Sequence, residues 1–157
     1  MNDSKKLDSI LRHINNVRDN CLILGEKLIE EGELPLGLKL IANGHIHDNS
    51  KFTGIEWAYL NCETKENQPG LFFAALEQHQ KTNRHHPEYW PGGIEEMPSI
   101  YLAEMVCDVK GRSEEFGSSV LDWIKDECTR KYKFSTSGRV YKEMKRFLDL
   151  LIGEKFK

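Results

Sequence analysis

Apolar residues near the start of the chain recur at steps of three and four residues, and this spacing constrains the fold more than any other sequence feature. The repeat consists of Leu7, Ile10, Leu11, Ile14, Val17, Cys21, Leu24 and Leu28. Such spacing forms the apolar face of an amphipathic helix, which we expect to end near Gly32. The sequence contains no alternating apolar and polar pattern of strand length. It therefore predicts an all-α protein.

The remaining helical patterns divide the chain into short segments of one domain. Helices are predicted at 35–47, 54–62, 71–79, 100–112, from 120 onward and at 138–152, and a plain loop is predicted at 65–70. A chain of 157 residues suits a single hydrophobic core. We expect one helical bundle of about six to seven helices, with residues 10–112 carrying its functional core and further helices at 118–153.

Composition and charge narrow the class of protein. Hydrophobic residues make up 39% of the chain and charged residues 30%, as in soluble globular proteins. No apolar run has the length of a membrane span, and the first residues lack the apolar region of a signal peptide, so we expect a cytoplasmic protein. Four cysteines are scattered without a C-x-x-C pair, which indicates thiols rather than disulfides or a zinc knuckle.

The net charge of −3 is unevenly distributed along the chain. Residues 125–157 carry ten Lys or Arg residues against five Asp or Glu residues. A basic segment can meet nucleic acid or a phosphorylated substrate, but a solvated helix face is the commoner role. We therefore expect neither a nucleic-acid partner nor a membrane partner.

Five of the six histidines and two aspartates follow one another in an order typical of a binuclear metal site. The candidate ligands are His13, His47, Asp48, His79, His85, His86 and Asp108. Imidazole and carboxylate ligands without thiolates suit Mn, Fe, Zn, Co or Ni. We expect two divalent transition-metal ions with Asp48 as the bridging carboxylate. Structural zinc sites favour cysteine, which makes a purely structural site the weaker interpretation.

Individual members of this set also have ordinary explanations. His13 lies beside the apolar stripe of its helix, where a boundary histidine in contact with water is common. Asp108 could pair with Arg112, which follows it by one helical turn. The ordered set as a whole, rather than either residue, favours metal binding.

Two pairs of histidines need a choice between neighbours. His45 and His47 point to different sides of a helix, and we choose His47 because Asp48 follows it; His45 is expected to be exposed or to support a ligand. His85 and His86 precede a proline, which disturbs helical register, so both stay candidates.

The ligand order resembles that of a known superfamily. The pattern His13 … His47-Asp48 … Asp108 resembles the HD-domain superfamily of metal-dependent phosphohydrolases, which has an all-helical fold. The segments that resemble its HD-GYP phosphodiesterases are His47-Asp48-Asn49-Ser50-Lys51, similar to their H-D-x-x-K, and His85-His86-Pro87-Glu88, similar to their H-H-E. The residues Tyr89-Trp90-Pro91-Gly92-Gly93 stand where the G-Y-P signature would be. The chain is more similar still to a small HD-like family of bacteria and their phages.

This resemblance implies hydrolysis of a phosphoester, either a monoester or a diester, with a nucleotide as the expected small-molecule substrate. A metal-bridging hydroxide would attack phosphorus, with Asp48 and Lys51 as catalytic residues. Lys51, Arg112 and Glu88 are expected to bind the substrate, although Lys51 could instead be a solvated surface amine. Trp57, Tyr59, Tyr89 or Trp90 could stack a base, but aromatic residues more often belong to the core.

Two other functions fit parts of the same pattern. Di-iron oxygenases such as myo-inositol oxygenase resemble this ligand order, and fold and ligands alone do not determine the reaction. A non-catalytic module, such as a nucleotide sensor stabilised by metal, is the third interpretation. Metal analysis followed by a phosphoester screen with Mn²⁺ separates these alternatives.

Overall fold

Helix α1 (Asp3–Glu30) runs along one whole edge of the molecule, and α2 (Leu34–Ile46) returns antiparallel beside it. The computed structural model describes residues 2–153. This part of the chain contains helices and turns but no strand, so the predicted all-α class is confirmed. No helix within it is both long and apolar enough to cross a membrane.

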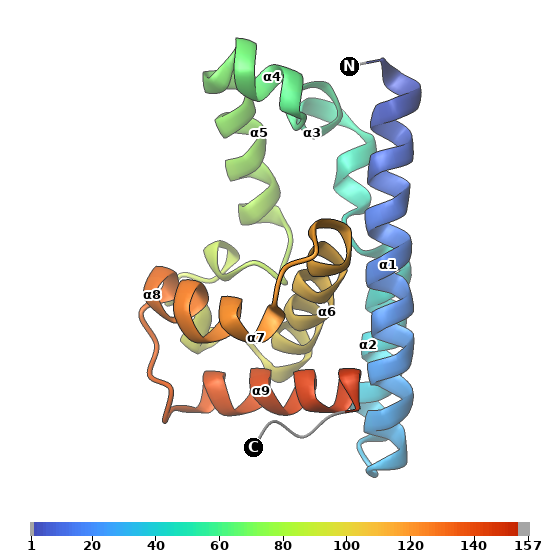
Figure 1. Ribbon diagram of the computed structural model, residues 1–157, viewed down its shortest axis with the longest axis vertical. Coiled ribbons are helices and arrows are strands. Elements are labelled where there is room, and N and C mark those ends of the chain that lie inside the picture. The colour runs from blue at the N-terminus through green and yellow to red at the C-terminus, as the bar shows by residue number, and fades with distance from the viewer. Residues whose placement is uncertain (1, 154–157) are drawn as a thin grey trace.

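The rest of the chain folds against this hairpin (Figure 1). The further α-helices are α3 (Gly54–Tyr59), α4 (Cys62–Asn67), α5 (Pro69–Thr82), α6 (Ser99–Phe116), α7 (Val120–Asp122), α8 (Thr129–Tyr132) and α9 (Arg139–Ile152). Short 3₁₀ segments are η1 (Asn49–Phe52), η2 (Pro87–Tyr89) and η3 (Gly93–Glu96), and η4 (Trp123–Cys128) is a π-helical turn. The described residues thus contain more helical segments than the six to seven expected.

Two glycines allow the backbones of α1 and α2 to touch. Gly25 and Gly37 are buried and face each other across the hairpin. A Cβ atom on Gly25 would lie 2.8 Å from the carbonyl oxygen of Gly37, closer than real Cβ contacts come. Further along, a Cβ atom on Gly44 would lie 2.7 Å from the Cβ of Cys21. This close packing brings the end of α2 against the middle of α1.

The hydrophobic core lies where α1, α6 and α9 meet. Its fully buried members include Leu24, Leu28, Val106, Phe147 and Leu148. Helix α9 crosses beneath α6 at one end of the molecule, while α3, α4 and α5 form the other end (Figure 1). The polar cluster described below lies between these two ends.

Two local expectations are corrected. Residues 65–70, expected to be a plain loop, belong to the end of α4 and the first turn of α5. The Asn61 side chain accepts a hydrogen bond from the backbone N–H of Thr64, and Pro69 starts α5 with a backbone angle already suited to a helix. The helix expected from residue 120 forms as one continuous run through α7, η4 and α8, and is corrected only in that its middle is π-helical.

Candidate metal centre

Five separate segments bring the candidate ligands together. His13 comes from α1, His47 and Asp48 from the end of α2, His79 from α5, His85 and His86 from the following loop, and Asp108 from α6. The chain turns sharply at Asp48, whose φ of 55° and ψ of 23° place it in the left-handed region. This turn ends α2 and directs both His47 and Asp48 into the molecule, where both are buried.

Asp48 lies at the middle of the cluster and faces two groups of histidines. Its Oδ2 is 3.5 Å from Nε2 of His13 and 3.5 Å from Nε2 of His47. Its Oδ1 is 3.4 Å from Nε2 of His79 and 3.3 Å from Nε2 of His85. The two carboxylate oxygens therefore point to different nitrogen sets, which is the arrangement of a bridging carboxylate.

The remaining candidates complete these two sets. Asp108 Oδ1 lies 3.0 Å from Nε2 of His13, and His86 Nε2 lies 3.0 Å from Nε2 of His79. The donor atoms of His13, His47 and Asp108 lie within 4.8 Å of one another. The same is true of the set Asp48, His79, His85 and His86. The structure thus brings together all seven residues proposed as ligands.

Three buried or largely buried glutamates hold the far sides of the histidine rings. Glu104 Oε1 lies 3.0 Å from Nδ1 of His47 and 3.3 Å from Nδ1 of His85. A carboxylate at Nδ1 fixes the orientation of an imidazole and leaves Nε2 as the coordinating nitrogen. One glutamate on α6 therefore orients one histidine from each set.

The other two glutamates do the same for single histidines. Glu115 Oε1 lies 3.0 Å from Nδ1 of His13, and Glu56 Oε2 lies 2.9 Å from Nδ1 of His79. Sequence reasoning did not assign a role to any of the three. The available signal was weak: Glu104 precedes Asp108 by four residues and shares its helix face.

Several buried atoms of this cluster lack a hydrogen-bond partner among the described residues. They include Nε2 of His13, His47 and His85, and Oδ1 of Asp48. A buried polar atom without a partner costs about 1–3 kcal/mol. These four atoms face the same interior space, and nitrogen and oxygen donors of this kind fit divalent transition metals. Buried His and Asp groups here can hold metal ions.

The charges around Asp48 keep the carboxylates ionised. Burial opposes ionisation of Asp48, but His47 and Lys51 outweigh it and hold its pKa well below the usual range. Burial likewise disfavours the charged form of His85, but Asp48 and Glu104 raise its pKa to about 10. His86 differs, because burial and then the charge of His85 lower its pKa to about 3. A neutral imidazole is the form that binds metal.

A cavity of about 560 Å³ opens onto the cluster. His13, Asp48, His79, His86 and Asp108 form one part of its wall. The apolar part includes Ile10, Leu60, Phe72, Leu76, Val109, Phe116, Val120 and Trp123. Such a volume and lining are typical of small-molecule sites.

Comparison with known proteins places the chain in a family. The model of a family of unknown function, DUF5662, matches residues 2–153. The chain belongs to DUF5662. Searches of curated proteins and of solved structures returned no match. Membership in DUF5662 assigns no activity, so the resemblance to HD-domain proteins stays a prediction.

In this DUF5662 member, Lys51 is not a solvated surface amine. It is buried within η1, and its Nζ lies 2.6 Å from Oδ2 of Asp48. The left-handed Asp48 ends α2 and turns the chain into η1. Lys51 also lines the cavity.

The other proposed substrate residues are placed differently. Arg112 lines the cavity, and its Nη1 lies 3.5 Å from Oε2 of Glu115. Glu88 is not among the cavity-lining residues; its Oε1 accepts a hydrogen bond from the Tyr132 hydroxyl at 3.2 Å. The aromatic residues considered for base stacking, Trp57, Tyr59, Tyr89 and Trp90, do not line the cavity either. Phe72, Phe116 and Trp123 are the aromatic residues there.

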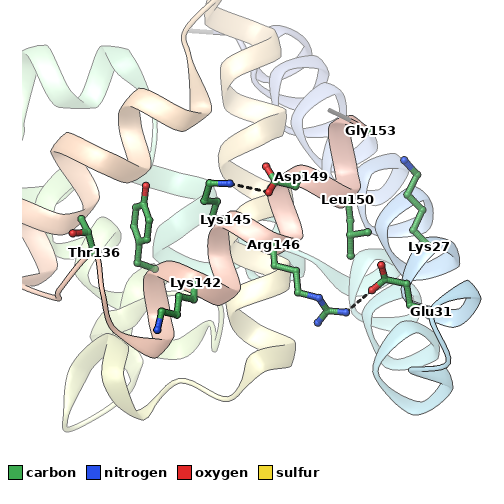
Figure 2. A pocket seen from close by; sticks show the side chains of 10 residues that line it. Lys27, Glu31, Thr136, Lys142, Lys145, Arg146, Asp149, Leu150 and Gly153 are labelled. Carbon is green, nitrogen blue, oxygen red and sulfur yellow. Dashed lines mark hydrogen bonds and ion pairs between the residues drawn. The ribbon is translucent and has the colours of Figure 1, made fainter. Parts of the chain in front are cut away.

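A second cavity of the DUF5662 fold, of about 650 Å³, lies against α9 and the end of α1. Figure 2 shows Lys145 directed at Asp149, and Arg146 at Glu31, within it. The ion-pair distances are 3.0 Å and 2.6 Å respectively. None of its lining residues is a histidine. Part of the basic charge of the C-terminal segment is thus paired, and the metal-ligand set lies elsewhere.

Proposed function

We propose that this protein is a metal-dependent phosphohydrolase of the HD type, which hydrolyses a phosphoester such as a nucleotide. The observation that carries this proposal is the position of Asp48, whose two oxygens face separate histidine sets. His13, His47, Asp48 and Asp108 would hold one divalent ion. Asp48, His79, His85 and His86 would hold the other. When bound, such ions supply Lewis acidity toward phosphate oxygens and lower the pKa of a coordinated water.

The charges that line the cavity support an anionic substrate. Asp48 and Asp108 are its acidic residues within the described chain, and both belong to the metal-ligand set. The cavity-lining cations are Lys6, Lys51, Lys65 and Arg112. Two divalent ions would bring four positive charges, whereas these two aspartates contribute only two negative charges. The loaded site would therefore attract phosphate.

Lys51 is the residue best placed to contact a transferred phosphate group. Its ammonium has three donor hydrogens, and the contact with Asp48 uses one of them. Arg112, four residues after Asp108 on α6, lies one turn further along the same wall. Fixed positive groups of this kind stabilise the charge that develops on phosphate oxygens. The apolar walls exclude water from the remainder of the substrate.

The four cationic side chains of the cavity favour a phosphohydrolase over an iron oxygenase that acts on a neutral polyol. A neutral substrate would gain little binding energy from these charges. The test is a panel of phosphomonoesters and phosphodiesters, nucleotides included, with protein loaded with Mn²⁺, Fe²⁺, Zn²⁺, Co²⁺ or Ni²⁺. We expect metal-dependent hydrolysis that Asp48→Asn abolishes. Turnover of none of the esters, together with oxygen consumption by the Fe²⁺ form, would favour the oxygenase.

A further inference from the structure

The cavity extends well beyond the metal-ligand set along two facing helices. Figure 1 shows α1 and α5 opposite each other, with α3 and α4 at the end that joins them. On α1, Lys6 precedes His13 by seven residues and shares its face. On α5, Phe72 precedes His79 by the same interval. Seven residues of helix span about 10 Å, so Lys6 and Phe72 mark a second end of the cavity.

Lys6 is held at this second end by contacts that fix its ammonium. The residue is 8% exposed, which is rare for lysine. Its Nζ donates to the carbonyl oxygen of Trp57 at 2.6 Å and lies 4.4 Å from the centroid of the Trp57 ring. Asp3 approaches to 3.7 Å, but its side chain is mostly in water. An ammonium has three donor hydrogens, so Lys6 can also bind an anion in the cavity.

A second lysine lines the same end from another helix. Lys65 comes from α4, and its Nζ lies 5.6 Å from the centroid of the Phe72 ring. Both Lys65 and Phe72 line the cavity with Lys6. The cavity therefore has cationic groups at both ends.

The wall of the cavity between the two ends is mostly apolar, although Ser9, Asn61 and Ser118 also line the cavity. Ile10, Leu60 and Leu76 lie along this wall. The amide of Asn61 makes two local hydrogen bonds: Oδ1 accepts from the Thr64 N–H at 2.9 Å, and Nδ2 donates to the Ala58 carbonyl oxygen at 3.3 Å.

We propose that Lys6 and Lys65 form a second anion-binding subsite, about 10 Å from the metal centre along α1. The substrate is accordingly a phosphoester whose apolar body carries a further anionic group, a carboxylate or a phosphate, at its far end. This inference rests on the proposed function, because the scissile phosphate would occupy the metal end. It adds a recognition element that the metal-ligand set does not require.

The subsite can be tested by binding, without turnover. The probes are 7-phosphonoheptanoate and heptylphosphonate, which have the same chain length and differ in the terminal carboxylate. Isothermal titration calorimetry with the Mn²⁺-loaded protein should give an affinity at least about tenfold higher for the carboxylate probe, the scale of one charge-assisted hydrogen bond. The double variant Lys6→Met, Lys65→Met should lose this preference while binding heptylphosphonate within about threefold of the parent.

Methionine retains most of the apolar stem of lysine, so packing against Trp57 is largely kept. Lys39→Met, on the exposed side of α2, is the matched control for the loss of a positive charge and should keep the preference. Circular dichroism and metal content check that each variant is folded and loaded. Equal affinity of the parent for both probes overturns the subsite, and so does a preference that survives the double variant.

Hydrolysis of the corresponding esters, 6-phosphonooxyhexanoate and hexyl phosphate, separates the two proposals. If both esters are hydrolysed at equal kcat/KM, the phosphohydrolase proposal stands and the second subsite fails. If neither is hydrolysed while the phosphonates bind with the expected preference, the subsite stands as a binding site and hydrolysis fails. If neither phosphonate binds to the metal-loaded protein, the subsite fails, while the phosphohydrolase proposal is decided by the ester panel.

Discussion

The Nε2 atoms of His79 and His86 face each other at a distance of 3.0 Å. Glu56 contacts Nδ1 of His79, which favours the tautomer with the proton on Nδ1 and leaves the lone pair of Nε2 free to coordinate. His86 is neutral at ordinary pH, since burial and the charge of His85 lower its pKa to about 3. Two imidazoles whose Nε2 atoms converge on one point form a natural pair of metal ligands.

We therefore expect protein purified without chelators to carry one to two transition-metal ions per chain. His86→Ala should lower this content by up to one ion, because it removes a donor from one set and leaves His13, His47 and Asp108 intact. Inductively coupled plasma mass spectrometry gives the stoichiometry. His45→Ala is the control, since His45 is exposed and absent from both sets. Folded, metal-free protein that takes up no Mn²⁺, Fe²⁺ or Zn²⁺ would contradict the metal prediction.

Asp48→Asn should lower the affinity for both ions and abolish phosphoester turnover. Asparagine keeps the size of the side chain and tolerates the left-handed backbone, but it lacks the charge that a bridging ligand provides. Metal titration and a phosphate-release assay on the same sample measure the two effects. Retention of two tightly bound ions in Asp48→Asn would show that Asp48 does not bridge them.

Glu104→Gln should weaken metal binding about 10- to 100-fold, the usual effect of removing a group that orients metal-bound histidines. Glu104 contacts Nδ1 of both His47 and His85, so both sets should be affected. Competition with a chelator of known affinity measures the change. Glu114→Gln is the matched control on the same helix, because Glu114 pairs with Lys110 at the surface. Equal losses in both variants would rule out an orienting role.

Lys51→Met should lower the stability of the metal-free protein but not of the metal-loaded protein. Turnover by the loaded protein should nevertheless fall. Without metal, the variant leaves the buried Asp48 short of its closest cation, and loss of one partner of a buried pair is strongly destabilising. Bound metal would replace that charge, so the loaded variant should melt close to the parent. Turnover should fall about 10²-fold in the loaded form. Thermal melts with and without EDTA, combined with kcat, test both statements.

Gly37→Ala should lower the free energy of unfolding by about 2 kcal/mol or more, because its methyl group would overlap the backbone of Gly25. Gly70→Ala, in the first turn of α5, meets no atom within 4 Å and should be neutral or stabilising. Urea denaturation of both variants measures the difference. Similar stabilities would mean that α1 and α2 can separate without cost.

The fold class and the candidate ligands could be predicted from the sequence. The glutamates that orient those ligands could not. Apolar periodicity is a local signal, so the long helices could be recognised from residues three and four positions apart. Glu115 and His13 are 102 residues apart, and Glu56 and His79 are 23 apart. No local pattern links such pairs, because only tertiary packing places them together.

Lys51 illustrates a different limit of the sequence. A solvated surface amine remained the alternative to a substrate-binding role, and only the structure excludes it, because Lys51 is buried beside Asp48. The left-handed Asp48 turns the chain into η1 and carries Lys51 under the surface. The aromatic lining was missed for a similar reason, since Phe72, Phe116 and Trp123 meet through the packing of three different elements.

Two independent requirements restrict the choice of residue at position 48: the left-handed backbone conformation and the proposed role of Asp48 as a bridging ligand. Among non-glycine residues, Asp and Asn adopt this backbone region most readily, whereas Glu gains no such local tolerance. A bridging ligand requires an anionic carboxylate, which excludes Asn and Gly. Lengthening the side chain to Glu would therefore incur backbone strain as well as displaced oxygens. If Asp48 bridges two ions as proposed, aspartate alone satisfies both the turn and the coordination, and each requirement excludes replacements that the other would accept.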